Sequence, residues 1–271
     1  MTNDEAARLD GERITLLLAE RASAWGNPVL LETTGSTNDE VQALAVQGAP
    51  EGTCVVAEQQ TAGRGRQGRE WVSPTGAGLW SSTLVRAGDV PKERWGWLSL
   101  VAGLAVRDAI QSATGVKTML KWPNDVVVEQ AACGGSSGPA KLGGILSNVV
   151  DDDAIVVGIG INVAMKSAEL PIPGATSVLL EGGACDREAL LADLLMALQV
   201  RIGQWRRGDR VFADDYRHAC LTIGRLVDVT MPDGHHLEGE VTGIDADGHL
   251  KVTDGEDVHT VTAGDVVHAS I

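Results

Sequence analysis

Apolar residues recur along the chain at two different periods, which predict both helices and strands. Helical spacing indicates helices over about residues 10–24, 95–113 and 186–205, the last with leucines along one side. Shorter helices are predicted around Val41–Ala45, ended by Gly48 in the left-handed conformation, and around Phe212–Cys220. The predicted strands are Val29–Leu31, Cys54–Ala57, Leu79–Val85, Val126–Val128, Ile145–Val150 and Ile155–Val163.

The pattern changes near Leu221. Beyond it, short apolar stretches are broken by Pro232-Asp233-Gly234, Asp247-Gly248 and Asp254-Gly255. Turn signals about every ten residues are typical of a small antiparallel β-barrel. We therefore predict an α+β domain over residues 1–220, followed by a small all-β domain over residues 221–271.

Composition and net charge disfavour several classes of function. Apolar residues make up 44% of the 271 residues, and the net charge is −15. Such an acidic surface repels nucleic acid and anionic lipid, so we expect neither as a general partner. The polar, acidic N-terminus and the shortness of the apolar run Ile14–Ala19 predict neither a secretory nor a membrane segment. The cysteines, which we interpret as ordinary thiols of a cytoplasmic protein, are Cys54, Cys133, Cys185 and Cys220.

The segment Gly63–Arg69 alternates glycine with three arginines. Three guanidinium groups so close together repel one another unless an anion lies among them. The glycines allow the backbone to approach a phosphate or carboxylate. A solvated basic loop is the alternative interpretation. The segment is neither a P-loop nor a dinucleotide-binding fingerprint.

Two further polar segments can each be explained either by local structure or by binding of a ligand. In Ser36-Thr37-Asn38, Thr37 and Glu40 form the pattern of a capping box, which predicts a helix start, while Ser36 and Asn38 remain free for a ligand. In Lys121–Asp125, Pro123 makes a rigid turn into a strand. Its lysine, asparagine and aspartate also suit a nucleotide with Mg²⁺.

Two apolar strands carry unusual residues. Lys141–Leu146 begins with a lysine and the glycine pair Gly143 and Gly144, which is typical of a close approach by a ligand or another chain. Gly158–Val163 contains Asn162, a polar residue that must find hydrogen-bond partners inside a buried strand.

In this order, Ser36–Asn38, Gln60–Trp71, Lys121–Asp125, Lys141–Leu146 and Gly158–Val163 resemble the motifs of the biotin protein ligases, the biotin–[acetyl-CoA carboxylase] ligase family. The resemblance implies a mixed central β-sheet with flanking helices, of the class II synthetase-like type, and an SH3-like C-terminal barrel. It also implies a two-step reaction. Biotin and ATP with Mg²⁺ form biotinyl-5′-AMP, and a lysine of a biotin carboxyl carrier domain of an acyl-CoA carboxylase then takes the biotinyl group.

The resemblance also implies roles for individual residues, with Lys121 and Arg66 as the catalytic cations. The implied biotin contacts are Ser36, Thr37, Asn38, Gln60, Gly63, Arg64, Gly65, Arg66, Lys121, Gly143 and Gly144. The implied contacts to ATP or the adenylate are Arg64, Arg66, Arg69, Trp71, Asn124, Asp125 and Asn162. No metal ligand is firmly implied, and Asp125 is the one candidate for Mg²⁺. Because a carboxylate must attack an anionic phosphate, positive groups that act most strongly in the transition state would accelerate the reaction.

Several alternatives and departures remain at this stage. A lipoate–protein ligase shares the implied fold, and a biotin-responsive DNA-binding regulator is a different class, disfavoured by the charge. Only about 30 residues precede the predicted strand that leads to Ser36, so we expect the single-function type of ligase, as a monomer or weak homodimer. We expect residues 129–140 to form a mobile loop and the arginine segment to become ordered on binding its ligand. The histidines of the last domain are interpreted as turn or surface residues, since their spacing fits no metal site.

Overall fold

The computed structural model describes residues 8–129 and 138–268, so most of the loop predicted at 129–140 lies outside the described residues. A seven-stranded sheet forms the centre, in the order β1-β2-β3-β7-β6-β5-β4. β1 and β2 are parallel and the other pairs are antiparallel, which confirms the mixed sheet. The strands are β1 (Val29–Thr34), β2 (Cys54–Gln60), β3 (Gly78–Arg86), β4 (Met119–Lys121), β5 (Asp125–Val128), β6 (Ala140–Val149) and β7 (Ala154–Asn162).

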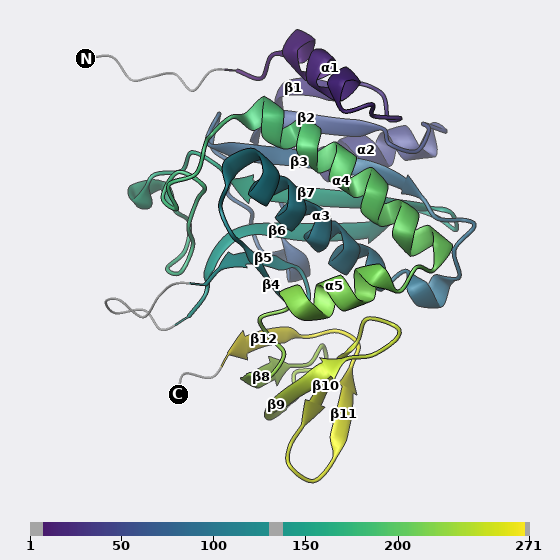
Figure 1. Ribbon diagram of the computed structural model, residues 1–271, viewed down its shortest axis with the longest axis vertical. Coiled ribbons are helices and arrows are strands. Elements are labelled where there is room, and N and C mark those ends of the chain that lie inside the picture. Colours follow the sequence, from purple (N-terminus) through teal and green to yellow (C-terminus); the bar gives the residue numbers. More distant parts are fainter. Residues whose placement is uncertain (1–7, 130–137, 269–271) are drawn as a thin grey trace.

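Two long helices cover one face of this sheet, α3 (Trp97–Thr114) and α4 (Arg187–Arg207), and α2 (Thr37–Val46) lies on the opposite face (Figure 1). α3 is buried along most of its length and is the centre of the apolar core. The left-handed conformation predicted at Gly48 is confirmed, with φ of 84°, and Gly115, which follows α3, is also left-handed, with φ of 75°.

Two predicted elements differ from the structure. The helix expected over residues 10–24 is α1 (Gly11–Glu20), which begins at Asp10 because the Asp10 carboxylate accepts backbone N–H groups of the first turn. The strand expected from Ile145 begins earlier, at Ala140, so that both glycines of the pair lie inside β6. β4 was not predicted, because three residues are too few to show a period.

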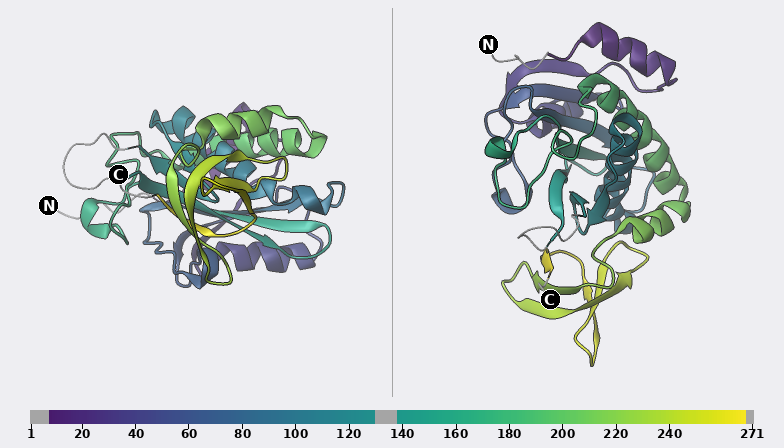
Figure 2. Two further views of the ribbon diagram at one scale, coloured as in Figure 1. Left: turned by 90° about the horizontal axis from the view of Figure 1, so that it is seen from below. Right: turned by 60° about the vertical axis from the view of Figure 1, so that its left-hand side comes forward.

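The C-terminal part is a five-stranded antiparallel sheet in the order β11-β10-β9-β8-β12, at the opposite end of the molecule from α1 (Figures 1 and 2). α5 (Val211–Ala219) precedes it and lies beside α3. The strands are β8 (Leu226–Thr230), β9 (His236–Ile244), β10 (Leu250–Thr253), β11 (Val258–Val261) and β12 (Asp265–His268).

The turn between β9 and β10 joins the two parts. The indole N–H of Trp97 donates to the carbonyl of Ala246 at 2.7 Å, and that of Trp122 donates to the carbonyl of Gly248 at 3.1 Å. Because Trp122 lies in the Lys121–Asp125 turn, the C-terminal sheet supports one of the motifs singled out in the sequence.

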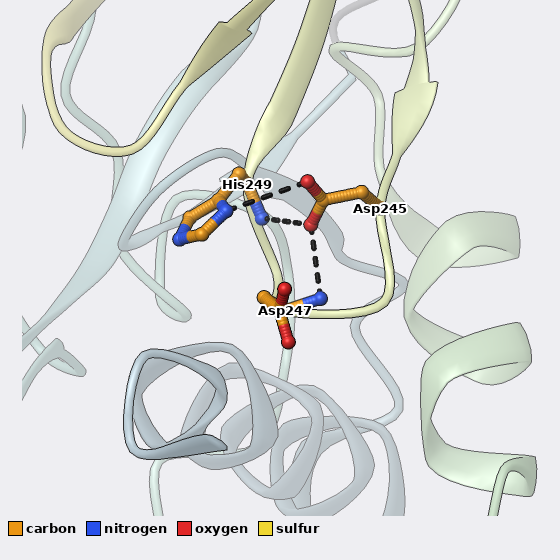
Figure 3. Close-up of side chains that lie close together, drawn as sticks. All are labelled: Asp245, Asp247 and His249. Carbon is orange, nitrogen blue, oxygen red and sulfur yellow. Dashed lines mark hydrogen bonds and ion pairs between the residues drawn. The ribbon is translucent and has the colours of Figure 1, made fainter. Parts of the chain in front are cut away.

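Asp245, Asp247 and His249 lie close together in this turn (Figure 3). The Asp245 carboxylate accepts the backbone N–H groups of Asp247 and His249, at 2.9 and 3.0 Å. Burial raises the pKa of Asp245, but these hydrogen bonds and the nearby His249 outweigh it, so that the pKa is lowered overall. His249 is thus a turn residue, as predicted.

His268, at the end of β12, gives the fold a pH dependence. Its pKa is lowered to about 4, chiefly by burial and also by the positive charges of Lys121 and Arg225. The unfolded chain takes up this proton at an ordinary pKa of about 6.5. Between pH 6.5 and 4 the unfolded state therefore binds more protons than the folded state, and stability falls as the pH falls. We expect His268→Gln to flatten this loss in urea denaturation at pH 7, 5.5 and 4.5; an unchanged slope would exclude His268 as its cause.

Among the described residues, no helix is both long and apolar enough to cross a membrane.

Candidate active site

A cavity of about 480 Å³ lies on the α2 side of the central sheet, where the C-terminal sheet meets it. Most of the predicted site residues line it: Ser36, Thr37, Asn38, Gln60, Arg64, Gly65, Arg66, Arg69, Trp71, Lys121, Asn124, Asp125, Gly144 and Asn162. Gly63 and Gly143 are not among the lining residues. Several further lining residues were given no ligand-binding role from the sequence, including Lys141, Gly158 and Gly160, which lie inside two of the motifs, and Asp265, which lies in none.

Glycines form the floor of this cavity. Gly144 on β6 pairs with Gly160 on β7, and the indole of Trp71 lies on both. A Cβ atom at Gly160 would come within 2.6 Å of that indole, so any larger residue would displace the ring. Because consecutive strand residues face opposite sides, Gly143 points away from the cavity, and its Cβ would meet the carbonyl of Gly160 at 2.8 Å. Of the glycine pair, only Gly144 is placed for a ligand.

Gly63 has a role within the loop. A Cβ atom there would collide with the carbonyl oxygen of Trp71, and it would lie 3.1 Å from the side-chain nitrogen of Gln60. The backbone N–H of Trp71 donates to the Gly63 carbonyl at 2.9 Å. Gly63 therefore lets the arginine segment fold back on itself, which explains its residue type without a ligand contact.

Trp71 presents an unsatisfied donor. Its ring packs edge to face against Trp80, with centroids 6.3 Å apart, and the ammonium of Lys141 lies 5.3 Å from the ring centroid. The indole Nε1 is buried and has no hydrogen-bond partner in the described structure. Buried N–H groups rarely remain unpaired. Trp71 is therefore placed to donate to a ligand or to move when one binds.

The arginines that line the cavity are paired with carboxylates of the chain itself. Arg64 pairs with Asp39. Asp265 of β12 lies 2.9 Å from Arg69 and 3.7 Å from Arg66, which also donates to the carbonyl of Gly264. Burial is the main cause that lowers the pKa of Arg66. The anion expected among these arginines is therefore supplied in part by Asp265, which the sequence could not reveal because it lies about 200 residues away. Ordering of the segment on ligand binding stays a prediction.

Lys121 differs from these groups. It ends β4 and is half-buried, and its ammonium has no hydrogen bond or salt bridge to any described residue. Its pKa is lowered, chiefly by burial and further by the positive charge of Lys141, while Asp125 opposes the shift. Lys141 has a direct partner, since its ammonium lies 2.6 Å from the Asp125 carboxylate. Lys121 is the cation left available to an incoming anion.

The side-chain amides of Asn124 and Asn162 both donate hydrogen bonds to backbone carbonyls. Asn124 donates to the carbonyl of Ile145 at 2.8 Å and so fixes the Lys121–Asp125 turn to β6. Asn162 donates to the carbonyl of Thr176 at 2.9 Å. The prediction that this buried asparagine finds a hydrogen-bond partner is confirmed, and the partner is a carbonyl outside its strand. The turn also contains a cis peptide bond between Trp122 and Pro123.

The predicted capping box at Thr37 and Glu40 is wrong. Ser36 is the N-cap residue of α2, and its side chain makes no capping hydrogen bond; the backbone N–H of Thr37 is accepted by the side chain of Gln60 at 2.9 Å. The Thr37 hydroxyl instead lies between Gln60 of β2 and Ser82 of β3, at 3.1 and 2.7 Å. Glu40 accepts the hydroxyl proton of Thr34 at 2.6 Å. The strands next to α2 offer Thr37 better-placed partners than its own helix does, and a local pattern cannot show this.

Comparison with known proteins agrees with the fold. Residues 30–165 match the biotin/lipoate A/B protein ligase family, and residues 222–269 match the biotin protein ligase C-terminal domain. The chain therefore belongs to the biotin/lipoate A/B protein ligase family, and its C-terminal match is to the biotin protein ligases within it.

Several of the similar proteins are biotin ligases. The chain is 42% identical to a biotin–[acetyl-CoA-carboxylase] ligase of Mycobacterium tuberculosis, with 99% of each chain covered. It is 41% identical to the enzyme of that name from Paracoccus denitrificans, over 61% of this chain and 68% of that one. The structure of the biotin protein ligase from Aquifex aeolicus in complex with biotin and ATP has a TM-score of 0.76 and 26% identity, and it covers 90% of this chain and 100% of that one.

Proposed function

We propose that the protein activates biotin with ATP and transfers the biotinyl group to a lysine of a biotin carboxyl carrier domain of an acyl-CoA carboxylase. The observation that carries this proposal is which of the basic side chains around the cavity are paired with a carboxylate. Arg64, Arg66, Arg69 and Lys141 are matched by carboxylates of the chain, whereas Lys121 has no carboxylate partner among the residues that the structure describes. The names of the similar ligases support biotin, ATP and a carboxylase carrier as substrates.

In the first step, a carboxylate oxygen of biotin attacks the α-phosphorus of ATP, and pyrophosphate leaves with the electrons of the broken P–O bond. Both reactants are anions, and negative charge increases on the phosphate oxygens in the transition state. A half-buried ammonium such as that of Lys121 stabilises this charge more strongly than water does. Arg66 also lines the cavity, and in this proposal it holds the carboxylate and phosphate together.

In the second step, the free amine of the carrier lysine attacks the carbonyl carbon of the mixed anhydride, and the acyl C–O bond to the phosphate breaks. AMP leaves with the electrons of that bond, and the nitrogen loses a proton to solvent as the amide forms. No nucleophile of the enzyme is needed, because the biotin carboxylate and the carrier lysine perform both attacks. Mg²⁺ is usually held by substrate phosphates and one or two carboxylates. Asp125 fits this role, and its present partner Lys141 would then be released.

A biotin ligase and a lipoate ligase, the nearest alternative, are distinguished by the substrate that each attaches to the carrier. We expect incubation of the protein with ATP, Mg²⁺, biotin and a carrier domain to add the mass of one biotinyl group, read by intact mass spectrometry. The same mixture with lipoate in place of biotin is the control and is expected to leave the carrier unchanged. Lipoylation without biotinylation would instead assign the protein to the lipoate ligases of the same family.

A further inference from the structure

The strand that carries Lys121 is the last strand of the central sheet, and the segment that joins the two parts of the chain runs along its outer edge. On the inner side, β4 pairs with β5, where Lys121 lies opposite Asp125. On the outer side lie residues 220–222, between α5 and β8, and Leu120 forms a parallel bridge with Cys220. Residues 220–222 are called the linker below. β4 is therefore held by the sheet on one side and by the linker on the other.

The linker bonds the backbone immediately before and immediately after Lys121. The backbone N–H of Leu221 donates to the carbonyl of Leu120 at 2.8 Å. The backbone N–H of Trp122 donates to the side-chain hydroxyl oxygen of Thr222 at 3.1 Å. All four of these residues are buried, so bulk water does not compete for the bonds. The main chain of Lys121 is thus fixed between two hydrogen bonds to the linker.

The hydroxyl of Thr222 is the part of the linker that a substitution can remove. Thr222 is fully buried and does not line the cavity, and the Nε2 atom of His268, at the end of β12, lies 3.4 Å from its hydroxyl. The thiol of Cys220 also lies near the Trp122 N–H, but sulfur is a weak acceptor. A buried N–H that loses its partner is costly. We therefore expect the turn after Lys121 to shift when this hydroxyl is removed.

The position of the Lys121 ammonium depends more on its backbone than that of the other cavity cations does. The charged ends of Arg64, Arg69 and Lys141 are each held by a carboxylate of the chain. The Lys121 ammonium has no such partner among the described residues, so its main chain and its packing set where it stands. A charge stabilises a transition state best when it is preorganised. A displacement of about 1 Å can lower a rate by a factor of about 10².

We propose that Thr222 is a positioning residue that holds the turn after Lys121 and so sets where the Lys121 ammonium stands in the cavity. The inference rests on the proposed function, in which that ammonium stabilises the transition state of adenylate formation. Thr222 acts through the backbone N–H of Trp122 and touches neither reactant. Because Lys121 acts chiefly on the transition state, its displacement lowers kcat and leaves the KM values for biotin and ATP nearly unchanged.

The rates of biotinyl-5′-AMP formation by Thr222→Val and Thr222→Ser test this proposal. Valine has nearly the shape of threonine but lacks the hydroxyl, whereas serine keeps it. We expect Thr222→Val to lower kcat about tenfold, with little change in KM for biotin or ATP. We expect Thr222→Ser to stay close to the wild-type rate. A loss of stability alone would not lower kcat, because the rate is expressed per folded protein molecule.

A double-mutant cycle with Lys121→Met separates an effect through Lys121 from an independent one. In the Lys121→Met background, we expect Thr222→Val to have no further effect on the rate. The matched control is Thr83→Val, at a buried threonine of β3 that does not line the cavity and whose hydroxyl bonds the thiol of Cys54. It should keep the wild-type kcat. If Thr222→Val does not fold, Thr222→Cys takes its place, since a thiol is only a weak acceptor.

Four outcomes would overturn the role of Thr222. They are an unchanged kcat in Thr222→Val, a rise in KM in place of the loss of kcat, a Thr222→Ser variant as slow as Thr222→Val, and an equal loss of kcat in both backgrounds. In each case, biotinyl-5′-AMP formation by the wild type would still support the proposed function. A wild type that forms no biotinyl-5′-AMP would overturn both.

Discussion

Lys121→Met is expected to lower the rate of biotinyl-5′-AMP formation by a factor of about 10² to 10³, the usual effect of removing one preorganised charge from a transition state. Methionine keeps most of the side-chain volume, so the fold and the melting temperature should be retained. The rate is measured by HPLC of the acid-quenched reaction. Lys117→Met is the matched control, because Lys117 is exposed four residues earlier and does not line the cavity; it should be as active as the wild type.

The charge of Lys121 also predicts a pH dependence. The active form is protonated, and burial lowers the pKa of this lysine below its ordinary value. The rate of adenylate formation should therefore fall on the alkaline side, as the pH rises through that lowered pKa and before an ordinary lysine titrates. Lys121→Arg keeps the charge at all accessible pH values. Its residual activity should lose this alkaline limb, and an alkaline limb that persists would assign the titration to another group.

Glu58→Gln is expected to destabilise the fold by about 3–5 kcal/mol, because it replaces the carboxylate that faces a buried guanidinium with a neutral amide. Glu58 on β2 and Arg187 at the start of α4 are both buried, with 2.7 Å between Oε2 and Nη1. Arg187 also donates to the carbonyl of Gly78, and Glu58 accepts the backbone N–H of Leu9 at 2.6 Å. The pair therefore joins β2, β3, α4 and the N-terminal segment.

Urea denaturation, with the free energy of unfolding extrapolated to water, measures this effect. The double variant Glu58→Gln/Arg187→Met is the control, since removing both charges together avoids an unpaired charge in the core. We expect it to recover a large part of the stability that the single variant loses. A single variant as stable as the wild type, or a double variant with the sum of two full losses, would show that the pair does not act as a unit.

The sequence predicted the elements that have a clear period. The α3 and α4 helices, the long strands of the central sheet and the change near Leu221 all follow from apolar spacing and turn residues. Short elements such as β4 could not be predicted, because three residues carry no period. The capping box failed for a different reason: the pattern at Thr37 is local, whereas the hydroxyl finds its partners on β2 and β3.

Site residues that lie in recognisable motifs were predicted from the sequence. Site residues that reach the cavity only through tertiary packing were missed. Gly160 and Gly158 look like ordinary strand glycines until Trp71 and Asn38 are seen lying on them. Asp265 has no motif around it and reaches the arginines only because the C-terminal sheet folds against the central one. Ser82 likewise resembles any polar residue of a buried strand. Contacts between distant segments depend on tertiary packing, which neither composition nor spacing encodes locally.

The central claim is that an available ammonium in a basic cavity brings two anionic reactants together within an acidic protein. A crystal structure of the protein with bound biotinyl-5′-AMP tests it most directly. We expect the Lys121 ammonium within about 3 Å of an oxygen of the acyl phosphate, the distance of a charged hydrogen bond. An adenylate bound elsewhere, or bound in the cavity with Lys121 directed away from the acyl phosphate, would contradict the account.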